Sequence, residues 1–170
     1  MKIGIVGLGR MGRNMTIRLV KNGHHVVGYA RTKDSVDEAV KHGAIGAYSL
    51  EELTQKLSPP RHIWLMIPAG TPVEKTIHTL IPLLDLNDVI IDGGNSNYKD
   101  TVRRAHMLKE AGLHYVDVGT SGGIWGLTEG YSMMVGGEKK VVDGLRPILE
   151  TLAPGPTQGW GHVGTNGAGH

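Results

Sequence analysis

The chain has 170 residues, of which 39% are hydrophobic and 20% charged, and this composition is typical of a single globular domain. It contains no cysteine, which excludes disulfide bonds, thiolate zinc sites and cysteine nucleophiles. The formal net charge of +2 is small and the cations are scattered, so nucleic acid is not an expected partner. No apolar stretch approaches the roughly 20 residues that a membrane span needs.

Short strands and helices alternate from the N-terminus. Lys2–Val6 is a run rich in Ile and Val that ends at Gly7, and it predicts a strand buried on both faces. Residues 10–22 carry Met or Leu at every fourth position, which predicts a helix, and His25–Tyr29 predicts a second strand. Together these segments make one βαβ unit. Because the first apolar run is too short for a signal peptide, we expect a cytoplasmic protein.

The alternation continues to about residue 152. Ser49 followed by Glu51 and Glu52 marks a helix start, and Thr71 and Pro72 are expected at the cap and first turn of another helix. This pattern predicts a Rossmann-type α/β fold, with a doubly wound, mostly parallel sheet covered by helices on both faces. The remaining helices are predicted over residues 34–42, 71–84, 98–111 and 138–152, and the remaining strands over 62–67, 88–92, 114–118 and 131–135.

Residues 153–170 have a different character, rich in glycine and proline, with one short strand candidate at 161–163. We therefore predict a dinucleotide-binding domain over residues 1–152. The segment 153–170 is then expected to be an exit toward a further domain that this chain does not include.

A G-x-G-x-x-G run, Gly7-Leu8-Gly9-Arg10-Met11-Gly12, closes the first strand and opens the first helix. In that context the first glycine permits a tight turn, the second lets the backbone approach a pyrophosphate, and the third lets helix and strand pack closely. The helix N-terminus then offers free N–H groups to phosphates. The alternative is a glycine-rich turn without a ligand. Arg10 and Arg13 are placed either to reach phosphates or to be exposed.

The end of the second strand distinguishes between the two nicotinamide dinucleotides. An NAD site usually has Asp or Glu there, on the ribose 2′-hydroxyl. Here the strand is followed by Ala30, Arg31, Thr32 and Lys33, with no carboxylate at that position. Arg31 can form a fork with a 2′-phosphate, and Thr32 and Lys33 can add a hydroxyl and a second cation. The residues favour NADP over NAD, against the alternative of a solvated surface turn.

Three more segments each follow a strand or end the chain: residues 90–96 (IIDGGNS), 118–123 (VGTSGG) and 166–170 (NGAGH). Together with GLGRMGRN near the N-terminus, they resemble 6-phosphogluconate dehydrogenase, over essentially the whole chain. The segment Gly119–Gly130, which contains Ile-Trp-Gly-Leu, resembles most the shorter bacterial form. Another β-hydroxyacid dehydrogenase, of the 3-hydroxyisobutyrate type, would share the glycine turn and the Ser-Gly-Gly loop but does not usually carry Asp-Gly-Gly-Asn-Ser. A non-catalytic dinucleotide-binding module is a second alternative.

The resemblance implies roles for particular residues. Ile67, Pro68 and Ala69 would contact the cofactor, and Asn95 would bridge the cofactor and the sugar acid. The substrate would be held by Ser121, Gly122 and Gly123. Since ligands gather beyond the carboxyl ends of parallel strands, we expect these loops and the glycine turn to share one edge of the sheet.

The resemblance also implies a reaction: NADP-dependent oxidative decarboxylation of 6-phosphogluconate to ribulose 5-phosphate, without a metal, in gluconate use and the pentose phosphate pathway. The family's general base, a lysine, and its acid, a glutamate, belong to the segment after the Gly-Ala-Gly-His that matches Gly167–His170. A C-terminal helical domain and a homodimer are implied for the full-length enzyme. We therefore expect no catalytic residue in this chain and little or no turnover by it alone.

The histidines, one tryptophan and two methionines are further candidates for a functional role. His24 and His25 are adjacent and would point to opposite faces of a strand, so they cannot chelate together. No metal site is expected, since the other histidines considered stand without carboxylates at ligand spacing: His62, His78, His106, His114 and His162. Trp125, in the loop after Ser-Gly-Gly, either flanks the substrate site or packs. Met133 and Met134 fall in a predicted strand and are expected in the core.

Overall fold

Strand β1 (Lys2–Val6) lies in the interior of an eight-stranded sheet in the computed structural model, which describes residues 1–170. The other strands are β2 (His25–Tyr29), β3 (Ile45–Ala47), β4 (His62–Leu65), β5 (Val89–Asp92), β6 (His114–Ser121), β7 (Ser132–Gly136) and β8 (Trp160–Gly164). Their order is β3-β2-β1-β4-β5-β6-β7-β8. Strands β1 to β6 are parallel, β7 is antiparallel to β6, and β8 is parallel to β7.

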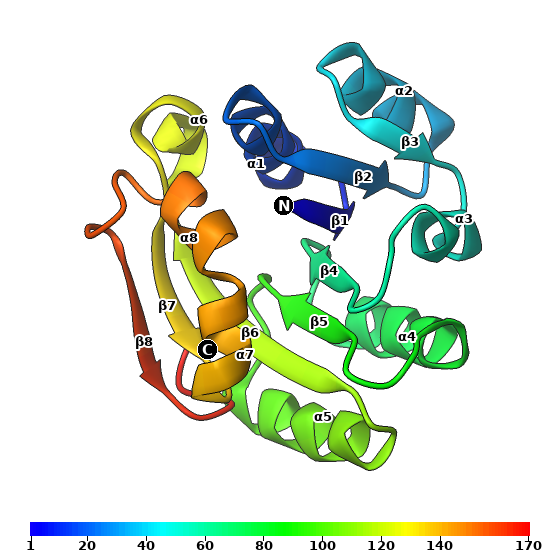
Figure 1. Cartoon of the computed structure of the whole chain (residues 1–170), viewed down its shortest axis with the longest axis vertical. Coiled ribbons are helices and arrows are strands. Elements are labelled where there is room, and N and C mark those ends of the chain that lie inside the picture. Colours follow the sequence, from blue (N-terminus) through cyan, green and yellow to red (C-terminus); the bar gives the residue numbers. More distant parts are fainter.

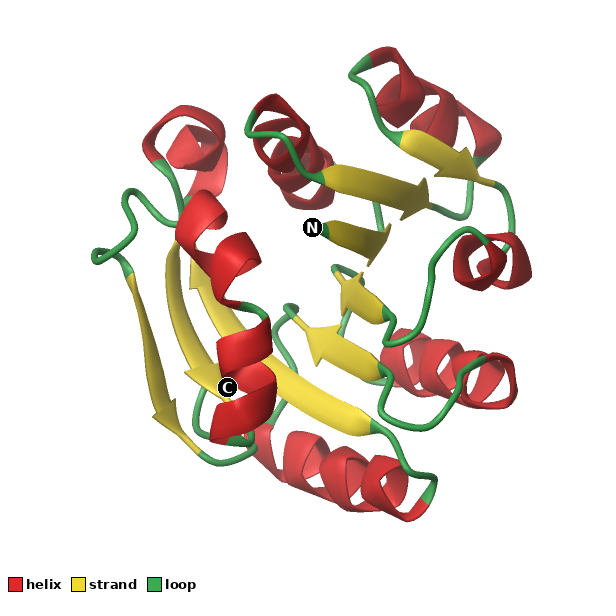
Figure 2. Ribbon diagram, viewed as in Figure 1, coloured by secondary structure: helices red, strands yellow, loops and turns green.

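Helices cover both faces of this sheet (Figures 1 and 2). They are α1 (Arg10–Lys21), α2 (Lys33–Lys41), α3 (Leu50–Gln55), α4 (Thr71–Leu80), α5 (Tyr98–Glu110), α6 (Gly126–Glu129), α7 (Lys139–Gly144) and α8 (Arg146–Leu152), with short 3₁₀ turns at Ile81–Leu83 and Gly123–Trp125. One apolar cluster joins the sheet to α1, α2, α7 and α8, and a second joins it to α3, α4 and α5. The predicted Rossmann-type, doubly wound, mostly parallel fold is confirmed. No helix has the length and hydropathy needed to cross a bilayer.

Two of the predicted helices have different bounds. The helix expected over 138–152 is two helices, α7 and α8. Pro147 lies in the first turn of α8 and has no N–H that could donate to a carbonyl oxygen of the preceding turn, so a single continuous helix is interrupted there. The helix from Thr71 ends at Leu80 and tightens into a 3₁₀ turn at Pro82. Its N-cap is Gly70, with φ 83°, so Thr71 is the first helical residue rather than the cap.

Strand lengths also depart from the predictions. Strand β6 runs three residues past Val118 because β7 pairs with it in antiparallel register, Gly119 opposite Met134 and Ser121 opposite Ser132. Strand β4 ends at Leu65 rather than residue 67, since the chain turns away toward Pro68. The short strand β3 and helix α6 were not predicted. Met134 is exposed rather than core, because side chains alternate along β7 and only Met133 and Val135 face the helices.

The residues after α8 return to the sheet. Strand β8, predicted at 161–163, pairs with β7. Beyond it, the buried Asp117 of β6 accepts hydrogen bonds from the backbone N–H groups of Gly167, Gly169 and His170, at 2.9, 2.8 and 3.1 Å. The last residues are thereby tied to the middle of β6. The domain boundary predicted at residue 152 stays a prediction.

The stability of the fold should depend on pH through His62, at the start of β4. Burial lowers the pKa of His62, and the weaker field of Asp88 acts in the opposite direction. In the unfolded chain the histidine pKa is about 6.5, so below that pH the unfolded chain binds more protons than the folded chain. The free energy of unfolding therefore falls as the pH drops below that value. We expect His62→Gln to lose less stability than the parent chain between pH 7.5 and 5.5 in urea unfolding, whereas substitution of the exposed His106 should leave the dependence unchanged. Equal losses in all three proteins would refute this role.

Candidate functional site

The carboxyl ends of β1, β4, β5 and β6 lie at one edge of the sheet, because these strands are parallel neighbours. The four loops predicted to share an edge therefore do so, but they line two cavities rather than one. The first has a volume of about 740 Å³ and lies beyond β1, β2 and β4. The second, of about 600 Å³, lies beyond β5 and β6, where antiparallel β7 and β8 begin.

The glycine turn forms the floor of the first cavity. Gly7 has φ 100°, and a Cβ there would lie 2.2 Å from the Met66 carbonyl oxygen. A Cβ on Gly12 would lie 1.9 Å from the Gly7 carbonyl oxygen, so the third glycine allows α1 to start directly against the turn. Gly9 differs from both, since nothing lies within 4 Å of a Cβ built on it and its φ of −67° is ordinary. The space above Gly9 is thus open to a ligand.

The N-terminus of α1 adds the features of a phosphate site. Gly9 is its N-cap, no side chain caps it, and no acidic residue lies in its first turn. Its first N–H groups therefore have no side-chain acceptor and carry the positive end of the helix dipole. A phosphate beside Gly9 would meet both.

The walls of the first cavity are apolar, hydroxylic or cationic. Arg31 and Thr32 follow β2, and Lys75 comes from α4, on the other side of β1. No Asp, Glu or His is among the lining residues. Thr32 also accepts a hydrogen bond from the Ser35 N–H as the N-cap of α2, so the positive end of a second helix faces the same space. The lining residues predicted as cofactor contacts are Gly7, Leu8, Gly9, Ala30, Arg31, Thr32, Ile67 and Pro68.

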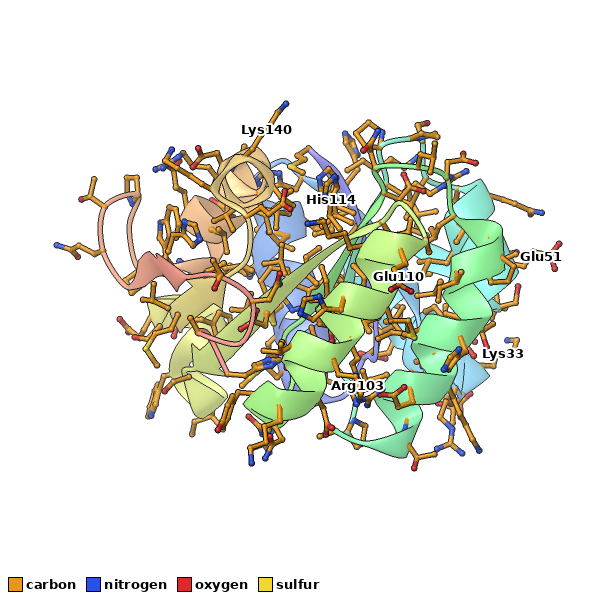
Figure 3. All side chains as sticks on the ribbon, turned by 90° about the horizontal axis from the view of Figure 1, so that it is seen from below. Lys33, Glu51, Arg103, Glu110, His114 and Lys140 are labelled. Carbon is orange, nitrogen blue, oxygen red and sulfur yellow. The ribbon has the colours of Figure 1, made fainter.

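Other residues predicted for the cofactor lie outside this lining. Lys33 is 77% exposed, points away from the domain in Figure 3, and pairs with Asp37 at 2.8 Å. Arg10 and Ala69 are exposed, and Met11 packs against the core. Asn95 lines the second cavity instead of the first. Residues of the first cavity that the sequence did not single out are Val6, Tyr29, Ser35, Leu50, Met66, Thr71, Pro72, Lys75 and Thr76.

The second cavity is lined mainly by neutral hydrogen-bonding groups. Asn95 and Ser96 come from the loop after β5, Ser121 ends β6, and Ser132 begins β7. Trp160 at the start of β8 and the exposed Met134 supply apolar surface. The lining contains no Asp, Glu, Lys or Arg, and His170 is its only histidine. Thr120 contributes a buried hydroxyl that has no hydrogen-bond partner. Such a set suits a ligand with several hydroxyls.

Gly122 and Gly123 do not line either cavity. Gly122 packs on the ring of Tyr131, where a Cβ would lie 2.7 Å from Cδ1. Gly123 has φ 50° and is exposed, as is the side chain of Trp125 at 66%. The loop is therefore supported from below by Tyr131 while its tip points to solvent.

Arg18 joins this loop to the helix of the glycine turn. It lies on α1 and donates to the carbonyl oxygens of Thr151 and Ala153 at the end of α8, both at 2.8 Å. It also donates to Leu127 of α6 at 3.1 Å. Nothing local in the sequence signals these contacts, since their partners are more than 100 residues away.

A buried polar network lies beneath the loops of both cavities. Asp92 at the end of β5 is inaccessible and accepts from Ser96 at 2.6 Å, Tyr115 at 3.1 Å and the Gly94 N–H at 3.0 Å. Burial, together with the Asp92 carboxylate, raises the pKa of the Tyr115 phenol, which keeps it a donor. His170 completes the arrangement, with Nε2 3.0 Å from the Asp92 carbonyl oxygen and Nδ1 2.7 Å from the Thr101 hydroxyl.

Residues 2–162 match the family model described as the NAD binding domain of 6-phosphogluconate dehydrogenase. A relative from Haloferax volcanii, named NAD(+)-dependent, decarboxylating 6-phosphogluconate dehydrogenase, is 44% identical over 170 residues, which are 100% of this chain and 56% of that protein. The chain thus spans little more than half of that relative.

Two solved structures have the same fold. Plasmodium falciparum 6-phosphogluconate dehydrogenase, described in complex with its cofactor NADP+, superposes with a TM-score of 0.92 at 32% identity over 99% of this chain and 38% of that one. Mycobacterium tuberculosis 3-hydroxyisobutyrate dehydrogenase gives a TM-score of 0.89 at 27% identity, over 99% and 56%. The match of the family model over residues 2–162 assigns the chain to the first of these two dehydrogenase families. The chain belongs to the 6-phosphogluconate dehydrogenase family and contains that family's nicotinamide-dinucleotide-binding domain.

Proposed function

We propose that this chain is the NADP-binding part of a decarboxylating 6-phosphogluconate dehydrogenase. The observation that carries the proposal is the first cavity, which combines the open glycine turn with two cations and no carboxylate. The residues fit the cofactor: the space above Gly9 admits a pyrophosphate against the N-terminus of α1, and the residues after β2 then face the adenosine ribose. When bound, NADP would supply the hydride acceptor.

The preference for NADP over NAD rests on charge. A carboxylate after β2 would repel a 2′-phosphate, whereas Arg31 offers a planar fork and Lys75 a second positive charge from α4. We propose Lys75, rather than Lys33, as the second cation near the 2′-phosphate, since Lys33 pairs with Asp37 on the surface.

Arg31→Ala should weaken NADPH binding by about 10- to 100-fold, the equivalent of one charge-assisted hydrogen bond. NADH binding should change by no more than about twofold, because it has no 2′-phosphate. Both affinities can be measured by fluorescence titration at constant moderate salt. Arg103→Ala is the matched control, an exposed arginine on α5 outside the cavity lining, and should change neither affinity. Equal affinities of the parent chain for NADPH and NADH would overturn the preference.

For the substrate, we assign 6-phosphogluconate to the second cavity. Asn95, Ser121 and Ser132 offer amide and hydroxyl groups to the hydroxyls of a sugar acid. Asn95 comes from the loop after β5, the strand of this cavity nearest β4, which supports the proposal that it contacts both ligands. A smaller substrate such as 3-hydroxyisobutyrate, with a single hydroxyl beside its carboxylate, would leave several of these polar groups without partners, which disfavours the alternative.

The proposed reaction is the oxidative decarboxylation of the pentose phosphate pathway, carried out by the full-length homodimeric enzyme. This chain would bind and orient both ligands, while the family's lysine base and glutamate acid would come from residues that follow Gly167–His170 in longer relatives. We therefore propose that residues 153–170 lead to a C-terminal helical domain. The purified 170-residue chain should form no NADPH from 6-phosphogluconate, and measurable turnover would contradict this division.

A further inference from the structure

A fully buried arginine lies between the loops of the two cavities. Arg104, on α5, has a side chain that is only 1% exposed. Its Nε donates to Glu74 of α4 at 2.7 Å, and one terminal nitrogen donates to the Ser96 hydroxyl at 3.1 Å and lies 3.7 Å from the Asp92 carboxylate. The other terminal nitrogen donates to the carbonyl oxygen of Gly70 at 3.5 Å.

These partners belong to two parts of the site, one on either side of Arg104. Gly70 ends the loop that carries Ile67 and Pro68 and is the N-cap of α4, which carries Lys75. Ser96 follows Asn95 in the second cavity. One guanidinium therefore fixes the position of the loop after β4 relative to the loop after β5. The planar fork of arginine can make all these bonds at once, which the single ammonium of a lysine cannot.

Stability alone does not explain a charge at this position. Burying an ion pair carries a desolvation penalty that a well-packed apolar side chain of similar volume avoids. The neighbouring Arg103 shows the contrast: it also bonds to Glu74, but it is 55% exposed and its other partner is Asp100 at 3.6 Å. Figure 3 shows Arg103 on the side of α5 that faces α4. Only Arg104 reaches the loops.

We infer that Arg104 is a positioning residue, which sets the spacing between the loop Met66–Gly70 and the loop Gly93–Ser96 and so aligns the nicotinamide half of the cofactor with Asn95. This inference rests on the proposed NADP site. With the pyrophosphate at Gly9 and the adenosine ribose at Arg31, the nicotinamide half extends across the ends of β4 and β5, between these two loops. Arg104 touches neither ligand and acts through Gly70 and Ser96.

Trp64 provides a local reporter of this spacing. It is 1% exposed, its indole N–H donates to the Met66 sulfur at 3.1 Å, and a Cβ on Gly93 would lie 2.2 Å from its Nε1. The indole is thus in contact with both loops. The chain has only three tryptophans, so the indole N–H signals in an NMR spectrum of ¹⁵N-tryptophan-labelled protein are few, and Trp64→Phe assigns the one of interest.

The test uses Arg104→Lys, which keeps a positive charge beside Asp92 and Glu74, and Ser96→Ala. The second variant removes the bonds of the Ser96 hydroxyl to Arg104 and to Asp92, and it leaves the bonds of Arg104 to Glu74 and Gly70 in place. Both should shift the Trp64 indole resonance of the ligand-free chain and leave the other two in place. Both should weaken NADPH at least about fivefold while 2′,5′-ADP, the adenosine half alone, binds within about twofold of the parent. The matched control Arg103→Lys should change none of these.

Two results would overturn the inference. One is an unshifted Trp64 resonance with unchanged NADPH affinity in both variants. The other is equal weakening of NADPH and 2′,5′-ADP with shifts in all three indole signals, which is general loss of structure. If the parent chain binds neither ligand, the proposed function fails, and the Trp64 resonance still decides whether Arg104 sets the loop spacing.

Discussion

Replacing Gly9 by alanine should weaken NADPH binding by at least about 100-fold and leave the chain as stable as the parent, or slightly more stable. The stability expectation follows from geometry. Gly9 has φ −67°, and a Cβ there meets no atom within 4 Å, so alanine fits without strain and restricts the unfolded chain. The binding expectation follows from the ligand, because the added methyl group would occupy the space in which the pyrophosphate meets the backbone, and each lost charge-assisted hydrogen bond is worth about 1.5–3 kcal/mol.

Gly12→Ala is the informative counterpart. Its Cβ would lie 1.9 Å from the carbonyl oxygen of Gly7, a backbone atom that cannot move aside cheaply. This variant should lose about 1–3 kcal/mol of unfolding free energy or more, and it should lose cofactor binding as a consequence. Urea unfolding and NADPH titration of both variants separate the two roles. If Gly9→Ala bound NADPH normally, the turn would be a structural glycine turn and the cofactor assignment would fail.

The parts of the fold that were predicted well are those with a local cause. Strand β1, helix α1 and strand β2 have the predicted bounds to within a residue, because a buried strand, an amphipathic period and a glycine stop are each encoded in a few neighbouring residues. Pro147 also has a local effect, but it lies inside an apolar periodicity that continues through it, so the break between α7 and α8 was missed.

The candidate site was predicted only in part for the same reason. The glycine turn and Arg31 follow from strand ends, and both line the first cavity. Lys75 was not singled out because a lysine on a helix is ordinarily a solvated residue, and its place depends on how α4 packs beside β1. The place of Ser132 and Met134 in the second cavity depends on β7 running antiparallel to β6, a direction that no residue of β7 indicates.

Long-range polar contacts are the features least accessible to sequence reasoning. Arg104 and Asp117 look like ordinary charged residues in a helix and a strand, yet the structure buries both at 1% and 0% exposure. Their partners lie 8 to 53 residues away along the chain, so no spacing rule connects them. Such residues are nevertheless the ones that hold the loops of the site in place.

Asp117→Asn is therefore expected to have the largest effect on stability, a loss of about 3 kcal/mol or more from a domain whose total is typically about 5–15 kcal/mol. One carboxylate oxygen accepts from Gly167, and the other accepts from both Gly169 and His170. An asparagine keeps one carbonyl oxygen and presents an NH₂ group to the remaining N–H donors. With the amide oxygen toward Gly169 and His170, the NH₂ group faces the Gly167 N–H, so one of the three hydrogen bonds is lost and two buried donors meet without an acceptor.

The C-terminal residues held by Asp117 should lose their structure before the whole domain unfolds. Urea unfolding should give a lower midpoint, and native-state hydrogen exchange should show faster exchange at Gly169 and His170 than in the central strand β1. Asp34→Asn, an exposed carboxylate, is the control and should change stability by no more than about 0.5 kcal/mol. Equal effects of the two substitutions would mean that the tail does not depend on Asp117. If the prediction holds, Asp117 is what keeps His170 against Asp92 and beside the second cavity.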